Sequence, residues 1–149
     1  MVADWLDVIS HGGAPTYEVR PVGWVESVLT DRSEAPKQPD EGAPPARIVF
    51  RPEFGEALSG LEVGARVVLL TWLHLGRRDV LTGHPRGDAS RAERGVFSTR
   101  SPERPNPIGL HTVTVTGVEP TAITVDSLEA VTGTPVLDVK PVLGPVAER

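Results

Sequence analysis

Glycine and proline are spread so evenly along this chain that no long helix fits between them. The 149 residues include 15 Gly and 15 Pro, and the longest stretches free of both are only 12 residues, Trp24–Ala35 and Thr121–Thr132. Proline inside a helix removes a backbone hydrogen bond, and glycine weakens the helix. Helical bundles and coiled coils are therefore excluded, and the length corresponds to one turn-rich domain.

Two segments carry the clearest strand patterns. Arg66–Leu75 is the most hydrophobic stretch, and its ten residues, rich in β-branched and aromatic types, favour a buried strand. Leu110–Val118 alternates between threonine and valine almost without exception, which is typical of a half-buried strand. After a turn, Ala122–Leu128 alternates again, so the two segments predict an antiparallel hairpin.

Weaker strand patterns at 17–28, 47–50 and 136–139 bring the total to six or seven short strands. Phe54–Leu61 has apolar residues at helical spacing and predicts one or two helical turns. We therefore predict an all-β fold, either a barrel or a sandwich. A closed barrel is favoured because closure protects the edge strands of a small sheet.

The remaining segments are expected to lie outside the strands. The polar stretches 30–45 and 75–93 are predicted to be long loops. The first sixteen residues are predicted to be a flexible extension, so the folded domain is expected to cover 17–149.

Composition excludes several kinds of site. The chain has no cysteine, which removes disulfides, thiolate zinc sites, iron–sulfur clusters and cysteine nucleophiles, and is compatible with a cytoplasmic location. Its four histidines are scattered, so no metal site is expected. No apolar run approaches the roughly 20 residues of a membrane helix, and no signal peptide is expected.

Charge is unevenly distributed. The formal net charge is −5, which argues against nonspecific binding to nucleic acid. The segment Arg77–Arg104 nevertheless contains seven arginines against four carboxylates, a net charge of +3. This segment is either a site for an anionic ligand or a solvated loop.

Gly95–Leu110 is the most informative segment. Its three prolines exclude a regular helix or central strand and restrict the loop before any ligand arrives, which lowers the entropic cost of binding. Arg100 and Arg104 can bind a carboxylate or phosphate through two N–H groups each, and Asn106 adds a polar side chain. The alternative is a rigid structural turn with exposed arginines.

A second segment, Gly133–Pro141, places a carboxylate and an ammonium two residues apart. Asp138 and Lys140 are expected on one face of a short strand. Such a pair can position a proton, or it can form an ordinary surface salt bridge.

Both segments resemble the TsaA-like (TrmO) family. The matching motifs are Arg100-Ser101-Pro102-x-Arg104-Pro105-Asn106-Pro107-Ile108-Gly109 and Gly133-Thr134-Pro135-Val136-Leu137-Asp138-Val139-Lys140-Pro141. Further matches are Pro21-Val22-Gly23-x-Val25-x-Ser27, Pro36-Lys37-Gln38 and Leu58-x-Gly60-Leu61-Glu62. The resemblance covers about Tyr17–Val142, in the right order.

The resemblance implies a small single-sheeted β-barrel with short helical turns and long loops that binds S-adenosylmethionine. It also implies a homodimer with the cofactor near the interface. The implied activity is N6-methylation of threonylcarbamoyl-adenosine beside the anticodon of tRNA. By resemblance, the cofactor contacts are Pro36, Lys37, Gln38, Leu73, His74, Arg100, Leu110, Asp126, Ser127, Leu128 and Glu129.

Methyl transfer needs alignment of donor and acceptor, and the acceptor nitrogen has to lose a proton. Asp138 is the candidate proton acceptor, Lys140 would orient it, and Asn106 completes the expected catalytic set. Arg104 is expected to bind the substrate, through a phosphate or carboxylate.

Four departures from the family pattern concern the substrate site more than the cofactor site. In the first, Glu129 stands where the family usually has the shorter carboxylate of aspartate. Lys37 replaces an arginine, Thr132 replaces a carboxylate, and Val142 replaces an aromatic residue. Two alternatives to the tRNA methyltransferase therefore remain. One is a methyltransferase of the same fold that acts on a small molecule or peptide, and the other is a non-catalytic S-adenosylmethionine-binding module.

Overall fold

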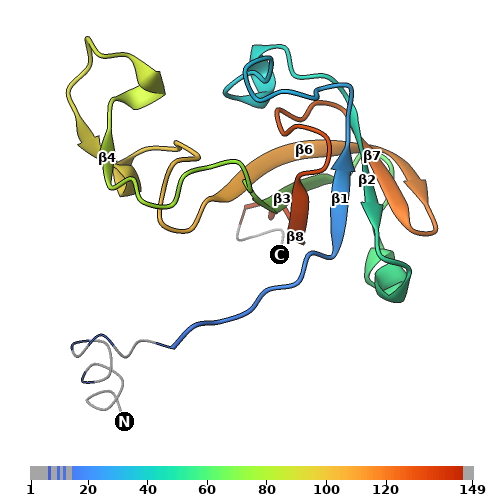
Figure 1. Cartoon of the computed structure of the whole chain (residues 1–149). Helices are drawn as coiled ribbons and strands as arrows, with labels where there is room; N and C mark the ends of the chain where they lie inside the picture. Colours follow the sequence, from blue (N-terminus) through green and yellow to red (C-terminus); the bar gives the residue numbers. More distant parts are fainter. Residues whose placement is uncertain (1–6, 8–9, 11, 13–14, 146–149) are drawn as a thin grey trace.

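The computed structural model describes residues 7, 10, 12 and 15–145 (Figure 1). Six antiparallel strands form one sheet in the order β1-β2-β7-β6-β3-β8, and β8 pairs back onto β1, so the sheet closes into a barrel. The strands are β1 (Gly23–Glu26), β2 (Ala46–Phe50), β3 (Arg66–Trp72), β6 (Ile108–Glu119), β7 (Ala122–Val125) and β8 (Pro135–Pro141). The all-β prediction is confirmed; most of the expected extension at 1–16 lies outside the described residues.

Short elements complete the chain. A separate two-stranded sheet pairs β4 (Thr82–Gly83) with β5 (Arg94–Gly95). The helical turns predicted at Phe54–Leu61 are present as a 3-10 helix that begins earlier, because Pro52 presets the helical backbone angle at its first position. The 3-10 helices are η1 (Pro39–Glu41), η2 (Pro52–Leu58), η3 (Pro85–Gly87) and η4 (Val96–Ser98).

The alternation of β6 sorts its side chains as expected. Val113 and Val115 are buried in the barrel, Thr112 and Thr116 are exposed, and Thr114 is half-buried. Burial of each such aliphatic side chain contributes roughly 1.5–3 kcal/mol. The fully buried interior comes from all sides of the barrel: Ile48, Leu69, Ile123, Val125, Leu128 and Val136.

Three strands are shorter than their sequence patterns suggest: β1 covers only Gly23–Glu26 of the pattern at 17–28, and β3 and β7 each end three residues early. β3 stops at Trp72 because the next residue, Leu73, donates its N–H to Pro107 O at 2.7 Å and the chain then turns. β7 stops at Val125, and Leu128 donates its N–H to Pro44 O at 2.9 Å. Both strands pair antiparallel with β6, so the chain leaves both at the end of the barrel where β6 begins.

Two loops meet at that end. The first loop (27–45) follows β1, and the arm (77–104) contains β4 and β5 and extends away from the barrel (Figure 1). Within the described residues, no helix is both long and apolar enough to span a membrane. In the same part of the chain, no three or more His, Asp or Glu side chains are grouped so as to hold a metal ion.

Candidate functional site

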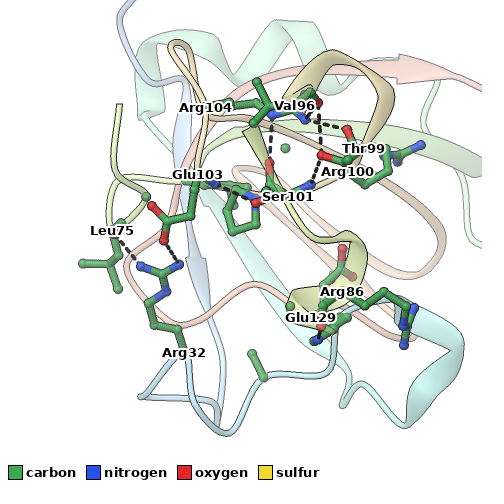
Figure 2. A pocket seen from close by; sticks show the side chains of 18 of the residues that line it. Arg32, Leu75, Arg86, Val96, Thr99, Arg100, Ser101, Glu103, Arg104 and Glu129 are labelled. Atoms are coloured by element: carbon green, nitrogen blue, oxygen red, sulfur yellow. Dashed lines mark hydrogen bonds and ion pairs between the residues drawn. The ribbon is translucent and has the colours of Figure 1, made fainter. Parts of the chain in front are cut away.

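A pocket of about 1030 Å³ lies where β3 leaves the barrel and β6 enters it. Its walls come from the first loop, the turn after β3, the arm, the start of β6 and the segment 129–134. Figure 2 shows arginine side chains of the first loop and the arm around this space. The volume lies just above the roughly 300–1,000 Å³ that is usual for small-molecule sites.

Arg104 holds the proline-rich loop together. Its Nε donates to Ser101 O at 2.8 Å, and its Nη2 donates to the carbonyls of both Val96 and Thr99 (Figure 2). Its backbone N–H also donates to Arg77 O at 3.0 Å. Although Arg104 lines the pocket, these backbone carbonyls occupy much of the hydrogen-bonding capacity expected to serve a substrate anion.

Arg100 lines the same pocket with more of its guanidinium available. Its Nη2 donates to Leu110 O at 3.1 Å, and its side chain is exposed. A guanidinium has five N–H donors, so one such bond leaves donors for a carboxylate or phosphate.

An ion pair joins the first loop to the arm. Arg32 Nη2 lies 2.7 Å from Glu103 Oε1, and Arg32 Nη1 donates to Leu75 O (Figure 2). The other oxygen of Glu103 accepts the backbone N–H of Arg77. Burial raises the pKa of the Glu103 carboxyl, but the hydrogen bonds from Arg32 and Arg77 outweigh it, and the pKa lies below its ordinary value.

A second connection lies further out on the arm. Lys37 Nζ donates to Arg86 O, and Arg86 Nη2 forms an ion pair with Glu41 Oε1. The hydrogen bond from Arg86 lowers the pKa of the Glu41 carboxyl. The two connections hold the walls of the pocket together at separate points.

A buried polar chain forms part of the pocket wall. Thr71 Oγ1 lies 2.7 Å from His111 Nε2, and His111 Nδ1 pairs with Glu129 Oε1. Thr71 and His111 are 0% and 3% exposed. Within the described residues, Glu129 Oε2 is a buried side-chain oxygen without a hydrogen-bond partner. Such an atom carries a desolvation cost unless a ligand or water supplies a donor.

The packing around Gly109 explains why the proline-rich motif has glycine at this position. A Cβ at this position would lie 2.3 Å from Thr71 Oγ1 and 2.7 Å from His111 Nε2. These separations are too short for non-bonded atoms, so glycine is needed for the hydrogen bond between Thr71 and His111 to form.

Many of the residues expected at the cofactor lie together. The pocket is lined by eight of the eleven residues, namely Pro36, Lys37, Gln38, Leu73, His74, Arg100, Leu110 and Glu129. The other three are not among its lining residues. Leu128 is buried in the core, and Asp126 Oδ1 accepts the N–H of Thr114 at 3.0 Å, whereas Ser127 lies between them and is half-buried.

The three residues expected to be catalytic lie outside the lining of the pocket. Asp138 and Lys140 share one face of β8, as predicted, and form an exposed ion pair of 3.3 Å. Asn106 is exposed, and its Oδ1 accepts a hydrogen bond from Arg78 at 2.9 Å. The role of Asp138 as proton acceptor stays a prediction.

Sequence reasoning missed the partners of Glu129. His111 has the inward phase of β6 that Val113 and Val115 share, and a histidine at an inward strand position was the available signal. Thr71 has the same phase as the buried residues Val67 and Leu69 on β3. Neither pattern indicates which polar group the side chain meets, because the partners come from separate segments.

Known proteins share this sequence pattern. The family model described as "tRNA-methyltransferase O N-terminal domain" (TrmO) matches residues 24–146. A "Probable S-adenosyl-L-methionine-binding protein" of Methanothermobacter thermautotrophicus is 44% identical over 123 residues, covering 83% of this chain and 88% of that protein. An "S-adenosyl-L-methionine-binding protein" of Archaeoglobus fulgidus is 37% identical over 122 residues, with 82% and 86% covered.

A solved structure agrees with the sequence matches. The crystal structure of TrmO from Pseudomonas aeruginosa has a TM-score of 0.70 to this chain at 32% sequence identity. The match covers 87% of this chain and 57% of that one, so this chain corresponds to little more than half of that protein. Because the family model covers most of the sequence and the similar structure has the same fold, the chain belongs to the TrmO family.

Proposed function

We propose that this chain is an S-adenosylmethionine-dependent methyltransferase that methylates N6 of threonylcarbamoyl-adenosine beside the anticodon of tRNA. Support comes from its membership of the TrmO family and from relatives named as S-adenosylmethionine-binding proteins. The observation that carries the proposal is the pocket itself. Residues far apart in the sequence, which the family resemblance assigns to the cofactor, line one cavity of suitable size.

The pocket offers the groups that this cofactor needs. Arg100 has N–H donors for its carboxylate, and Leu73 and Leu110 provide apolar surface for its base. Glu129 Oε2 needs an N–H or O–H donor from whatever fills the space. When bound, S-adenosylmethionine supplies an electrophilic methyl group on a sulfonium sulfur. The chain's task is then to align donor and acceptor and to exclude water.

The same proposal includes a second copy of the chain. Ile108 and Leu110, at the start of β6, line the pocket and are still 47% and 46% exposed, so they also provide apolar surface at its rim. A homodimer with the cofactor near the interface would cover them. Sedimentation at cofactor saturation tests this point, and a species of 15.9 kDa would contradict it. A tRNA substrate would place the protein in the cytoplasm.

A small-molecule or peptide acceptor is the second candidate. The net charge of −5 favours it, and so does the pairing of arginines on the arm. Arg77 pairs with Asp79 at 3.0 Å, and Arg91 pairs with Asp88 at 3.6 Å. Paired arginines contribute less to phosphate binding, which depends on net neutralisation of the nucleic-acid backbone.

Mass spectrometry of tRNA nucleosides tests the acceptor. Bulk tRNA from cells with and without the gene is compared, and the methyl mark on threonylcarbamoyl-adenosine is expected to vanish without it. An unchanged nucleoside profile would reject the tRNA acceptor and favour the small-molecule one. Methyl transfer from isotope-labelled cofactor by the purified protein distinguishes either methyltransferase from a non-catalytic binding module. Such a module would bind the cofactor and transfer no methyl group.

A further inference from the structure

The proposed function does not say which group supplies a hydrogen-bond donor to the free oxygen of Glu129. The residue lines the pocket, and its side chain is only 13% exposed. Its Oε1 is paired with His111, whereas its Oε2 is buried and has no partner. A buried carboxylate oxygen without a donor is costly, so the site is built for an occupant that provides one.

A chain of buried, hydrogen-bonded side chains that ends at its other oxygen restricts the orientation of the Glu129 carboxylate. An ionised carboxylate only accepts hydrogen bonds, so His111 Nδ1 carries the proton that it donates to Glu129 Oε1. In the neutral imidazole Nε2 then accepts the hydroxyl proton of Thr71, at 2.7 Å. Both side chains are almost fully buried, and Gly109 leaves the space that their contact requires. The chain Thr71–His111–Glu129 therefore restricts the carboxylate to one orientation.

The other carboxylate that lines the pocket, and two of its cations, are engaged elsewhere. Glu103 uses both oxygens, one on Arg32 and one on the backbone of Arg77. The cations of Lys37 and Arg86 are directed to a carbonyl and to Glu41. Among the described residues that line the pocket, Glu129 is thus the carboxylate with an oxygen free for a ligand.

Two further groups are less well placed to accept a proton. Asp138 lies outside the lining of the pocket, is half-exposed and is paired with Lys140. His74 lines the pocket but is exposed, with no described contact that orients its ring. A general base works best when its orientation is held before the reaction begins.

We propose that Glu129 is the proton acceptor for methyl transfer and that His111 and Thr71 are its positioning residues. This inference rests on the proposed function. A proton-accepting residue beside the cofactor implies that the methyl acceptor is a nucleophile that loses a proton, such as an N–H group. As the acceptor nitrogen bonds to the methyl carbon, the carbon–sulfur bond breaks and its electron pair stays on sulfur, leaving a thioether. The N–H proton moves to Glu129 Oε2 and later passes to water.

Glu129→Gln tests the role because it keeps the shape of the side chain and removes its basicity. Single-turnover methyl transfer is measured beside binding of S-adenosylhomocysteine, which carries no methyl group to transfer. We expect the rate to fall by at least about 100-fold while the dissociation constant changes by less than about threefold. Glu62→Gln is the matched control and is expected to retain the wild-type rate, because Glu62 is exposed, precedes the end of β3 that is opposite the pocket, and does not line it.

His111 provides the test of positioning. His111→Asn keeps an N–H donor near the place of Nδ1, whereas His111→Leu removes it. Both variants are expected to bind S-adenosylhomocysteine, and the asparagine variant is expected to transfer methyl groups faster. Equal rates for the two variants would overturn the positioning role. Thermal melting of both variants checks that they fold.

Three outcomes are decisive. If Glu129→Gln stays within about tenfold of the wild-type rate, or loses rate and S-adenosylhomocysteine affinity in parallel, the proton-acceptor role is wrong. If Asp138→Asn abolishes transfer while Glu129→Gln does not, the role belongs to Asp138. If the wild-type protein transfers no methyl group to any acceptor, the proposed function fails, and the inference fails with it.

Discussion

Arg32 Nη2 and Glu103 Oε1 are 2.7 Å apart although 71 residues separate them in the sequence. Their ion pair joins the first loop, which carries Pro36, Lys37 and Gln38, to the proline-rich loop that carries Arg100. The walls of the pocket are therefore connected directly to each other as well as through the barrel.

Glu103→Gln is expected to loosen this connection. The two side chains are 42% and 27% exposed, so the pair contributes at most about 1 kcal/mol, equivalent to about fivefold in affinity. We expect a loss of this size in S-adenosylhomocysteine binding, measured by calorimetry. Wild-type affinity in the variant would show that the walls do not depend on this contact.

The same pair predicts a pH dependence of stability. The pKa of Glu103 is lowered from 4.5 in the folded protein, so its contribution is complete above 4.5 and disappears as the pH falls through the folded value. The difference in unfolding free energy between wild type and Glu103→Gln, measured with urea, should therefore shrink from about pH 7 to about pH 3. A difference that persists in acid would contradict the assignment.

Gly109→Ala is expected to disrupt the hydrogen bond between Thr71 and His111. The added Cβ would lie 2.3 Å from Thr71 Oγ1, and overpacking of a buried site costs roughly 1–3 kcal/mol. Chemical denaturation measures the loss. Gly55→Ala is the control, because its Cβ would meet neighbouring atoms at 3.6 Å, an ordinary contact. Equal stability of the two variants would count against the close packing at Gly109.

Lysine variants of Arg104 and Arg100 are expected to differ in their effects: the first should lower stability, and the second should weaken cofactor binding. Arg104→Lys removes the guanidinium that donates to the carbonyls of Ser101, Val96 and Thr99. Each buried carbonyl left without a donor costs roughly 1–3 kcal/mol. We therefore expect faster proteolysis of the loop and a lower melting temperature. Arg100→Lys should leave the melting temperature near that of wild type and weaken S-adenosylhomocysteine binding. If Arg100→Lys instead lowers the melting temperature and Arg104→Lys weakens S-adenosylhomocysteine binding, Arg100 has the structural role and Arg104 the binding role.

Asp138→Asn is expected to have a small effect on folding. The ion pair with Lys140 is exposed on both sides, and such pairs contribute roughly 0–1 kcal/mol. If Glu129 accepts the proton, methyl transfer by Asp138→Asn should stay within about tenfold of wild type. A larger loss with cofactor binding retained would support the role that the sequence pattern suggests for Asp138.

Local patterns were enough to predict the elements of the barrel. The even spacing of glycine and proline excluded long helices, and the alternation of threonine and valine in β6 placed Val113 and Val115 inside. These features depend on near neighbours in the sequence, because backbone angles and side-chain faces repeat every few residues.

The tertiary structure was needed for the contacts between distant segments. The pattern around Arg104 predicts a free guanidinium, but the loop folds back so that backbone carbonyls surround it. The position of His111 on an inward face is local, whereas its partners, Thr71 on β3 and Glu129 beyond β7, lie 40 and 18 residues away. Which polar groups meet in a closed barrel depends on strand register and on loop closure, and neither is encoded in the periodicity of a single strand.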